Sequence, residues 1–173
     1  KIQIFWQFHA LHHAQTHLNF FTEYRTHYLA DLLKYTLEAI PLFMFEHSFV
    51  QVLLINRLRY WHTTIYHSNI RTNFSLLRYI LVTPQSHRIH HSVELRHRDR
   101  NYGLTFSIWD HIFATQYRNY DQYPQTGLDA QSQIQGLMED HNQNQNLGSS
   151  NWKILFEQIF YPLRLPPLKR QSK

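Results

Sequence analysis

Two segments of the chain carry the same spacing of three histidines, His-x-x-His-His. They place His9, His12 and His13 near the start of the sequence and a second triplet, His87, His90 and His91, further on. On an α-helix, residues three and four positions apart share one face, so each triplet would gather its imidazoles within one turn. Chance placement of the 14 histidines in 173 residues gives one such triplet about 0.1 times per chain and two about 0.004 times. The spacing therefore predicts two helical faces that bind metal, rather than histidines that are merely packed or solvated.

The cysteine content and the histidines between the triplets define the rest of the predicted ligand set. It contains no cysteine, so a metal would be held by imidazole, carboxylate or backbone oxygen. Between the triplets, His62 and His67 are five positions apart, which is about 140° on a regular helix, so both reach one site only at a bulge or a helix end. We predict eight metal ligands: His9, His12, His13, His62, His67, His87, His90 and His91.

This number of imidazoles exceeds what one ion takes, which indicates two metals. Imidazole suits iron, zinc, copper and nickel alike, but an all-neutral ligand set favours an iron pair that performs an oxidation over a hydrolytic zinc. Ligating histidines also need partners for their second ring nitrogen. The candidates near the triplets in sequence are Glu23, Asn69, Glu94, Asp99, Asn101 and Asp110.

The hydrophobic pattern predicts an all-α chain. Residues 5–19 have helical spacing, and Thr83 with Pro84 has the pattern of a helix start, in which threonine caps and proline occupies the first turn. Residues 28–60 are strongly apolar, with a break signal at Pro41. Residues 37–55 have the length of a membrane span but include Glu38 and Glu46, which favours a membrane-embedded helical hairpin over a single span.

Composition divides the chain into two parts. The 43% hydrophobic and 16% aromatic content excludes a disordered polypeptide, and residues 1–120 are expected to form the domain that carries the histidines. Residues 121–173 are richer in Gln, Asn, Asp and Ser and predict a polar, partly disordered tail, with a short amphipathic helix near 152–161. The net charge of +5 comes from Lys and Arg spread along the chain, so we expect no nucleic-acid partner.

Five blocks of the sequence, taken in order, resemble the fatty acid hydroxylase / sterol desaturase superfamily. They are Phe5-Trp6-Gln7-Phe8-His9-Ala10-Leu11-His12-His13, Thr22-Glu23-Tyr24-Arg25-Thr26-His27, His67-Ser68-Asn69, Thr83-Pro84-Gln85-Ser86-His87-Arg88-Ile89-His90-His91-Ser92, and Arg100-Asn101-Tyr102-Gly103 through Trp109-Asp110-His111-Ile112-Phe113-Ala114-Thr115. The resemblance implies an integral membrane protein whose histidine boxes lie on a cytosolic helical cap and hold two non-haem iron ions. It also implies O₂ as co-substrate and an external electron donor resembling cytochrome b5 or ferredoxin.

The activity implied by this resemblance is hydroxylation or desaturation of a C–H bond in a lipid, sterol or carotenoid, with residues 28–60 as the wall of a lipid tunnel or as a surface that faces lipid. The superfamily has an earlier His-x-x-x-His box, which would precede Lys1. We therefore expect the chain to be a fragment that lacks part of the ligand set. Tyr28 stands where relatives usually have proline, and Ala114 where they have glycine.

Three alternatives remain open from the sequence. A zinc hydrolase could use Glu94 as a base, although the usual His-Glu-x-x-His pattern is absent. A histidine-rich metal-buffering protein, or a basic nucleic-acid module, would not need the ordered spacing of the triplets. A catalytically incomplete relative would keep the fold without turnover.

Overall fold

The structure is a computed structural model that describes residues 3–128. The described part is helical and contains no β-strand longer than an isolated bridge, which confirms the all-α prediction. Its elements are α1 (Gln3–His13), η1 (Thr22–Tyr24), α2 (Tyr28–Met44), α3 (Phe49–His67), η2 (Ser75–Tyr79), α4 (Pro84–His90), η3 (Leu95–His97) and α5 (Ile108–Ile112). The amphipathic helix predicted near 152–161 lies outside the described residues.

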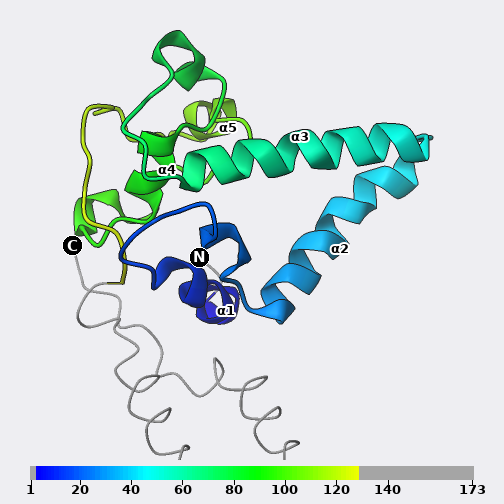
Figure 1. The fold of residues 1–173 in the computed structure, drawn as a ribbon, viewed down its shortest axis with the longest axis horizontal. Coiled ribbons are helices and arrows are strands. Elements are labelled where there is room, and N and C mark those ends of the chain that lie inside the picture. Colours follow the sequence, from blue (N-terminus) through cyan, green and yellow to red (C-terminus); the bar gives the residue numbers. More distant parts are fainter. Residues whose placement is uncertain (1–2, 129–173) are drawn as a thin grey trace, which may run out of the picture.

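Helices α2 and α3 are the long elements, and they form a hairpin. They meet at one end and diverge toward the other, where α1 and α4 lie (Figure 1). The open end of the hairpin thus brings the two histidine triplets, which are distant in sequence, close to the end of α3.

Of the two triplet-bearing helices, α4 starts as predicted, whereas α1 ends earlier than predicted. In α4, the Thr83 side chain accepts a hydrogen bond from the amide of Ser86 and Pro84 occupies the first turn, as predicted. Proline is favourable there because its missing N–H would have no intrahelical partner. Helix α1 ends at His13, earlier than the predicted residue 19, and Thr16 beyond it accepts a hydrogen bond from Thr126 far along the chain. A tertiary contact therefore replaces the last turn of the predicted helix.

The hairpin turn differs from the prediction. The break expected at Pro41 is wrong, because Pro41 lies inside α2, one turn before its end at Met44. A proline removes one hydrogen bond and crowds the carbonyl four residues earlier, which a helix tolerates near its end. The chain reverses at 45–48, where Ser48 and Gln51 form a capping box that starts α3. None of the helices in residues 3–128 combines the length and apolar character needed to cross a membrane.

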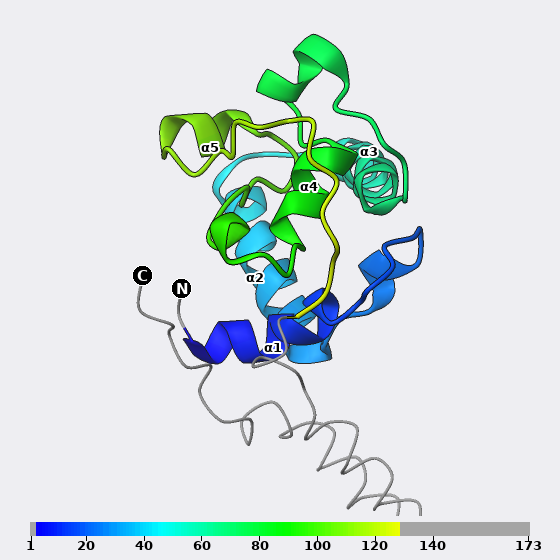
Figure 2. The same ribbon diagram turned by 90° about the vertical axis from the view of Figure 1, so that its left-hand side faces the viewer.

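Residues 116–128, here called the C-terminal strap, cross the outer side of α4 and reach α1 (Figure 2). The amide of Gly127 donates to the carbonyl of His91 over 3.0 Å, and the amide of Val93 donates to the carbonyl of Gln125 over 3.1 Å. The Thr126 hydroxyl donates to the carbonyl of Thr16 over 2.7 Å. The strap thus links the ends of the two triplet-bearing helices.

The domain boundary at residue 120 stays a prediction.

The centre of the described part is polar. Few large apolar side chains are fully buried, among them Leu18, Tyr66 and Ile89. The side chains buried around them are mostly polar, and they include His12, His13, His67, His87, His91 and His97. Burial of so many imidazoles is costly unless each one has a partner, so this core points to a bound group.

Candidate metal centre

Four histidines from three helices converge on one point. His12 comes from α1, His67 from the end of α3, and His87 and His91 from α4 and its cap. The Nε2 atom of His67 lies 3.1 Å from that of His12 and 2.8 Å from that of His87, and His87 lies 3.0 Å from His91 in the same way. All four side chains are buried. We call them the four-histidine cluster.

A second group lies directly beside the first. His9 and His13 of α1 and His90 of α4 have ring nitrogens within 4.8 Å of one another, and we call them the three-histidine cluster. The ring of His13 stacks on that of His91 at 4.2 Å between centroids, which places the two clusters in contact. A cleft lined by Trp6, His90 and Tyr102 opens next to this second cluster.

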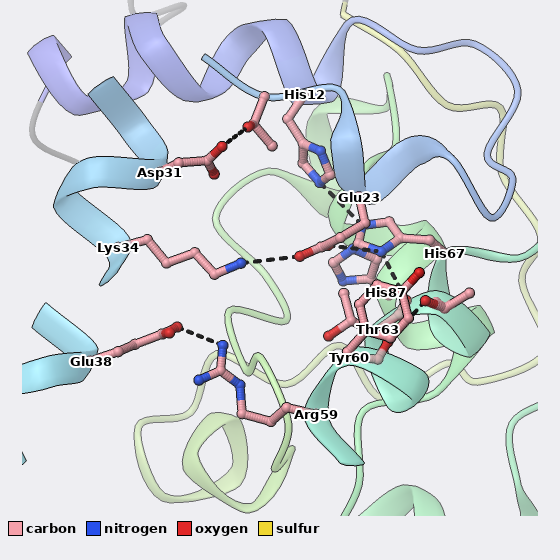
Figure 3. Close-up of polar contacts among 12 residues, drawn as sticks. His12, Glu23, Asp31, Lys34, Glu38, Arg59, Tyr60, Thr63, His67 and His87 are labelled. Carbon is pink, nitrogen blue, oxygen red and sulfur yellow. Dashed lines mark hydrogen bonds and ion pairs between the residues drawn. The ribbon is translucent and has the colours of Figure 1, made fainter. Parts of the chain in front are cut away.

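One histidine in each cluster is held by a backbone carbonyl. Nδ1 of His67 is 2.9 Å from the carbonyl oxygen of Thr63, one turn earlier in α3 (Figure 3). Nδ1 of His90 is 3.1 Å from the carbonyl oxygen of Arg100. A carbonyl only accepts, so each Nδ1 carries the proton and each Nε2 keeps its lone pair for a metal.

Burial keeps these rings neutral. Desolvation, followed by repulsion from His67 and His90, lowers the pKa of His12 to about 3. Desolvation, followed by repulsion from neighbouring histidines, also holds the pKa of His13, His87 and His91 well below the usual value. Neutral imidazole is the form that binds metal, so these four histidines are ready for ligation at neutral pH.

The low pKa of His12 predicts acid instability of the metal-free protein. The ordinary value of 6.5 applies to the unfolded chain and about 3 to the folded one, so the unfolded state takes up the proton first. Stability from neutral His12 is complete above pH 6.5 and is lost as the pH falls toward 3, by about 1.4 kcal/mol per pH unit for each such histidine. Urea unfolding between pH 7.5 and 4.5 should show this loss, and a free energy of unfolding independent of pH would contradict it.

The donor sets suit a transition metal. Neither cluster contains a carboxylate, and all-imidazole sets suit iron, zinc, copper or nickel rather than magnesium or calcium. The Nε2 atoms of His12, His67, His87 and His91 converge, each 2.8–3.1 Å from that of a neighbour. A cation bound at this point would offset the repulsion among their lone pairs. The residues present therefore fit a pair of metal ions.

The structure brings together seven of the eight predicted ligands, and their binding of metal remains a prediction. His62 lies outside both clusters, and its Nε2 donates to the carbonyl of Val82 over 2.9 Å. Helix α3 is regular up to its end at His67, so the five-residue spacing keeps the two rings on different sides. Only His67, at the helix end, meets the triplets.

The six residues proposed as histidine partners have mixed roles. Glu23 approaches Nδ1 of His67 at 3.5 Å. Asn101 donates to the carbonyl of Ser86 in α4 over 2.8 Å, while Asp110 accepts hydrogen bonds from backbone amides. The sequence analysis did not identify the backbone carbonyls of Thr63 and Arg100, because a carbonyl has no residue-specific pattern. For Thr63, its position one helical turn before His67 is a signal that could have indicated the contact.

Charged pairs line the inner side of the hairpin next to His67 (Figure 3). Lys34 of α2 binds Glu23 over 3.0 Å, and Arg59 of α3 binds Glu38 of α2 over 2.7 Å. These pairs join α2 to α3 and to η1 beside the four-histidine cluster. Both pairs are polar contacts on the inner side of the hairpin, while many large apolar side chains of α2 and α3 are exposed.

Helices that present seven buried or half-buried imidazoles in two adjoining clusters define the class of histidine-rich metalloproteins. Comparison with known families is more specific. The fatty acid hydroxylase family model matches residues 1–115, so the chain belongs to the fatty acid hydroxylase family. This confirms the resemblance drawn from the sequence blocks. The C-terminal strap lies beyond the matched residues.

Known relatives carry related names. Ornithine lipid hydroxylase OlsE of Rhizobium tropici is 34% identical over 110 residues, which cover 64% of this chain and 33% of the relative. Alkylglycerol monooxygenase of Caenorhabditis elegans is 30% identical over 128 residues, covering 72% and 24%. The human alkylglycerol monooxygenase is 30% identical over 117 residues, covering 66% and 25%. The matches span a third or less of these relatives' length. No solved structure gave a significant match.

Proposed function

We propose that the protein is an iron-dependent monooxygenase that hydroxylates a C–H bond of a membrane lipid. The observation that carries this proposal is the pair of adjoining clusters, in which seven imidazoles converge without a carboxylate. Family membership supports the reaction class, and the relatives named as a hydroxylase and as monooxygenases favour hydroxylation over desaturation.

In this proposal the four-histidine cluster holds one iron and the three-histidine cluster holds the other. Bound iron would supply the binding and reduction of O₂. The overall reaction inserts one oxygen atom of O₂ into the C–H bond and releases the other as water, and it consumes two electrons and two protons. The electrons come from an external carrier, resembling cytochrome b5 or ferredoxin.

The chain's own residues hold and shield the centre. The carbonyls of Thr63 and Arg100 hold the rings of His67 and His90 through Nδ1, so that Nε2 is the ligand atom in this proposal. The four-histidine cluster is enclosed, whereas the cleft beside Trp6 and Tyr102 leaves the three-histidine cluster accessible. We place the approach of the lipid on this accessible side, because a reacting carbon needs a route to the metals.

The hairpin is the proposed membrane attachment. Its tip exposes Met44, Phe45, Phe49 and Val50, with exposed fractions of 61–80%. Further exposed apolar side chains follow along both arms: Leu32, Leu37, Ile40, Leu53, Leu54, Leu58 and Trp61. An apolar surface of this extent marks a membrane or protein contact. Insertion of the hairpin tip into one leaflet would place the clusters at the membrane surface, on the side that we expect to be cytoplasmic.

The test uses the full-length protein, purified in detergent and loaded anaerobically with ferrous iron. Incubation with membrane lipid, a reducing system and ¹⁸O₂ is expected to give a lipid product that is heavier by one ¹⁸O atom, and to require iron. Oxygen derived from water, or equal turnover with zinc and no O₂, would overturn the proposal in favour of a hydrolase.

A further inference from the structure

Arg88 lies inside the second triplet segment but is not itself a ligand. Its side chain reaches from α4 to Asn69 and to the C-terminal strap, where it makes three contacts. Nε donates to the carbonyl of Pro124 over 2.7 Å, and an Nη donates to the Asn69 side chain over 3.0 Å. The guanidinium also lies 3.9 Å from the ring centroid of Tyr123.

Asn69 closes this set of contacts. Its side-chain oxygen accepts a second hydrogen bond, from the Tyr123 hydroxyl, over 2.6 Å. Arg88, Tyr123 and Asn69 thus contact one another in a ring, which we call the Arg88 clamp. It joins α4, the end of α3 and the C-terminal strap. A planar guanidinium suits this role because its donors point in fixed directions and its face stacks on an aromatic ring.

The position of Asn69 just beyond the end of α3 links the clamp to His67. His67 is the last residue of α3, and Asn69 follows two residues later. Helix ends fray because their last carbonyls lack intrahelical partners. His67 nevertheless has to stay within 2.8 Å of His87, which comes from a different helix. The clamp ties Asn69, two residues after His67, to Arg88, which directly follows His87.

We propose that Arg88 is a positioning residue for the metal centre, holding His67 of α3 against the histidines of α4 through Asn69 and the strap. This inference rests on the proposed metal centre. It also assigns a role to the strap, which lies outside the region matched by the family model. Residues beyond the histidine boxes thereby control the geometry of the four-histidine cluster.

The chain offers a matched control. Arg78 of η2 also stacks on a tyrosine of the strap, with its guanidinium 4.5 Å from the ring centroid of Tyr120. Arg78 hydrogen-bonds the Tyr79 hydroxyl and no histidine among the described residues. Arg88→Lys and Arg78→Lys therefore each remove a guanidinium that stacks on a tyrosine of the strap, but only Arg88→Lys changes the Arg88 clamp. Tyr123→Phe and Tyr120→Phe form a second pair, in which only Tyr123→Phe removes the hydroxyl bound to Asn69.

The experiment titrates Co²⁺ alone into the full-length protein in detergent. A His9→Ala, His90→Ala background removes two ligands of the three-histidine cluster, so that the visible absorption of Co²⁺ reports on the four-histidine cluster. Arg88→Lys is expected to weaken Co²⁺ binding by about 10–100-fold, the range for residues that orient metal ligands, and to change the absorption spectrum. Tyr123→Phe should weaken binding less, and both control variants should bind like the background protein.

The outcomes separate the two proposals. Co²⁺ binding by Arg88→Lys with the affinity and spectrum of Arg78→Lys overturns the clamp and leaves the metal centre intact. Failure of the background protein and of the protein with all its histidines to bind Co²⁺ overturns both. If Arg88→Lys does not fold, Tyr123→Phe decides the matter, because it removes a single hydroxyl: weaker binding than Tyr120→Phe supports the clamp and equal binding overturns it.

Discussion

Replacing His67 with alanine is expected to remove the metal from the four-histidine cluster, whereas replacing His62 is not. Both residues lie on α3, but only His67 directs Nε2 toward His12 and His87. Loss of one of four ligands should weaken binding by more than about 100-fold, the upper end of the range for residues that only orient ligands. Metal per chain, measured by elemental analysis after anaerobic loading with ferrous iron, provides the test.

His62→Ala is a close control because it changes the same residue type on the same helix. It removes the hydrogen bond to the Val82 carbonyl, so a loss of about 1 kcal/mol in stability is expected without loss of metal. Circular dichroism should show similar helix content in both variants. The assignment fails if His67→Ala keeps its full metal content, or if His62→Ala loses as much metal as His67→Ala.

The sequence predicts the parts of this centre that depend on local geometry. Three and four residue spacing puts each triplet on one helix face, and Thr83 with Pro84 starts α4 as expected. His62 and His67 could not be separated from the sequence, because their five-residue spacing allows either ring, but not both, to face the triplets on a regular helix. The end of α3 and its packing on α4 decide the matter in favour of His67.

Other features depend on contacts between distant segments. The carbonyl of Arg100 that holds His90 has no side-chain signal, because every residue has a carbonyl. The prediction placed the break at Pro41, which lies inside α2. The capping box of Ser48 and Gln51, which starts α3, is the local signal that marks the turn. The Arg88 clamp requires the strap to fold back over α4, and no periodic pattern in residues 116–128 indicates that path.

The second large effect is expected at Asp110, which supports the turn that presents the Arg100 carbonyl to His90. Its buried carboxylate accepts hydrogen bonds from the amides of Tyr102 and Gly103, over 2.7 and 2.8 Å, and from the Thr115 hydroxyl over 2.6 Å. Asp110→Ala would leave these donors unpaired. A loss of about 3–4 kcal/mol in the free energy of unfolding is expected, measured by urea denaturation of the metal-free protein.

Gly103 tests the same turn from the other side. A Cβ atom there would lie 2.6 Å from the carbonyl oxygen of Phe106 and 2.9 Å from the Asp110 carboxylate. Because a backbone atom cannot move aside as a flexible side chain does, Gly103→Ala should also destabilise the protein by separating Asp110 from the turn.

The effect on the metal centre should be selective. Displacement of the turn frees His90 from the Arg100 carbonyl, whereas His67 keeps its bond to Thr63 within α3. Asp110→Ala should therefore lose metal from the three-histidine cluster first and hold about one ion per chain where the unchanged protein holds two. Asp121→Ala, at an exposed carboxylate, serves as the control and should change stability by less than about 0.5 kcal/mol. Equal loss of both ions from Asp110→Ala would mean that the turn supports the whole fold rather than the position of His90.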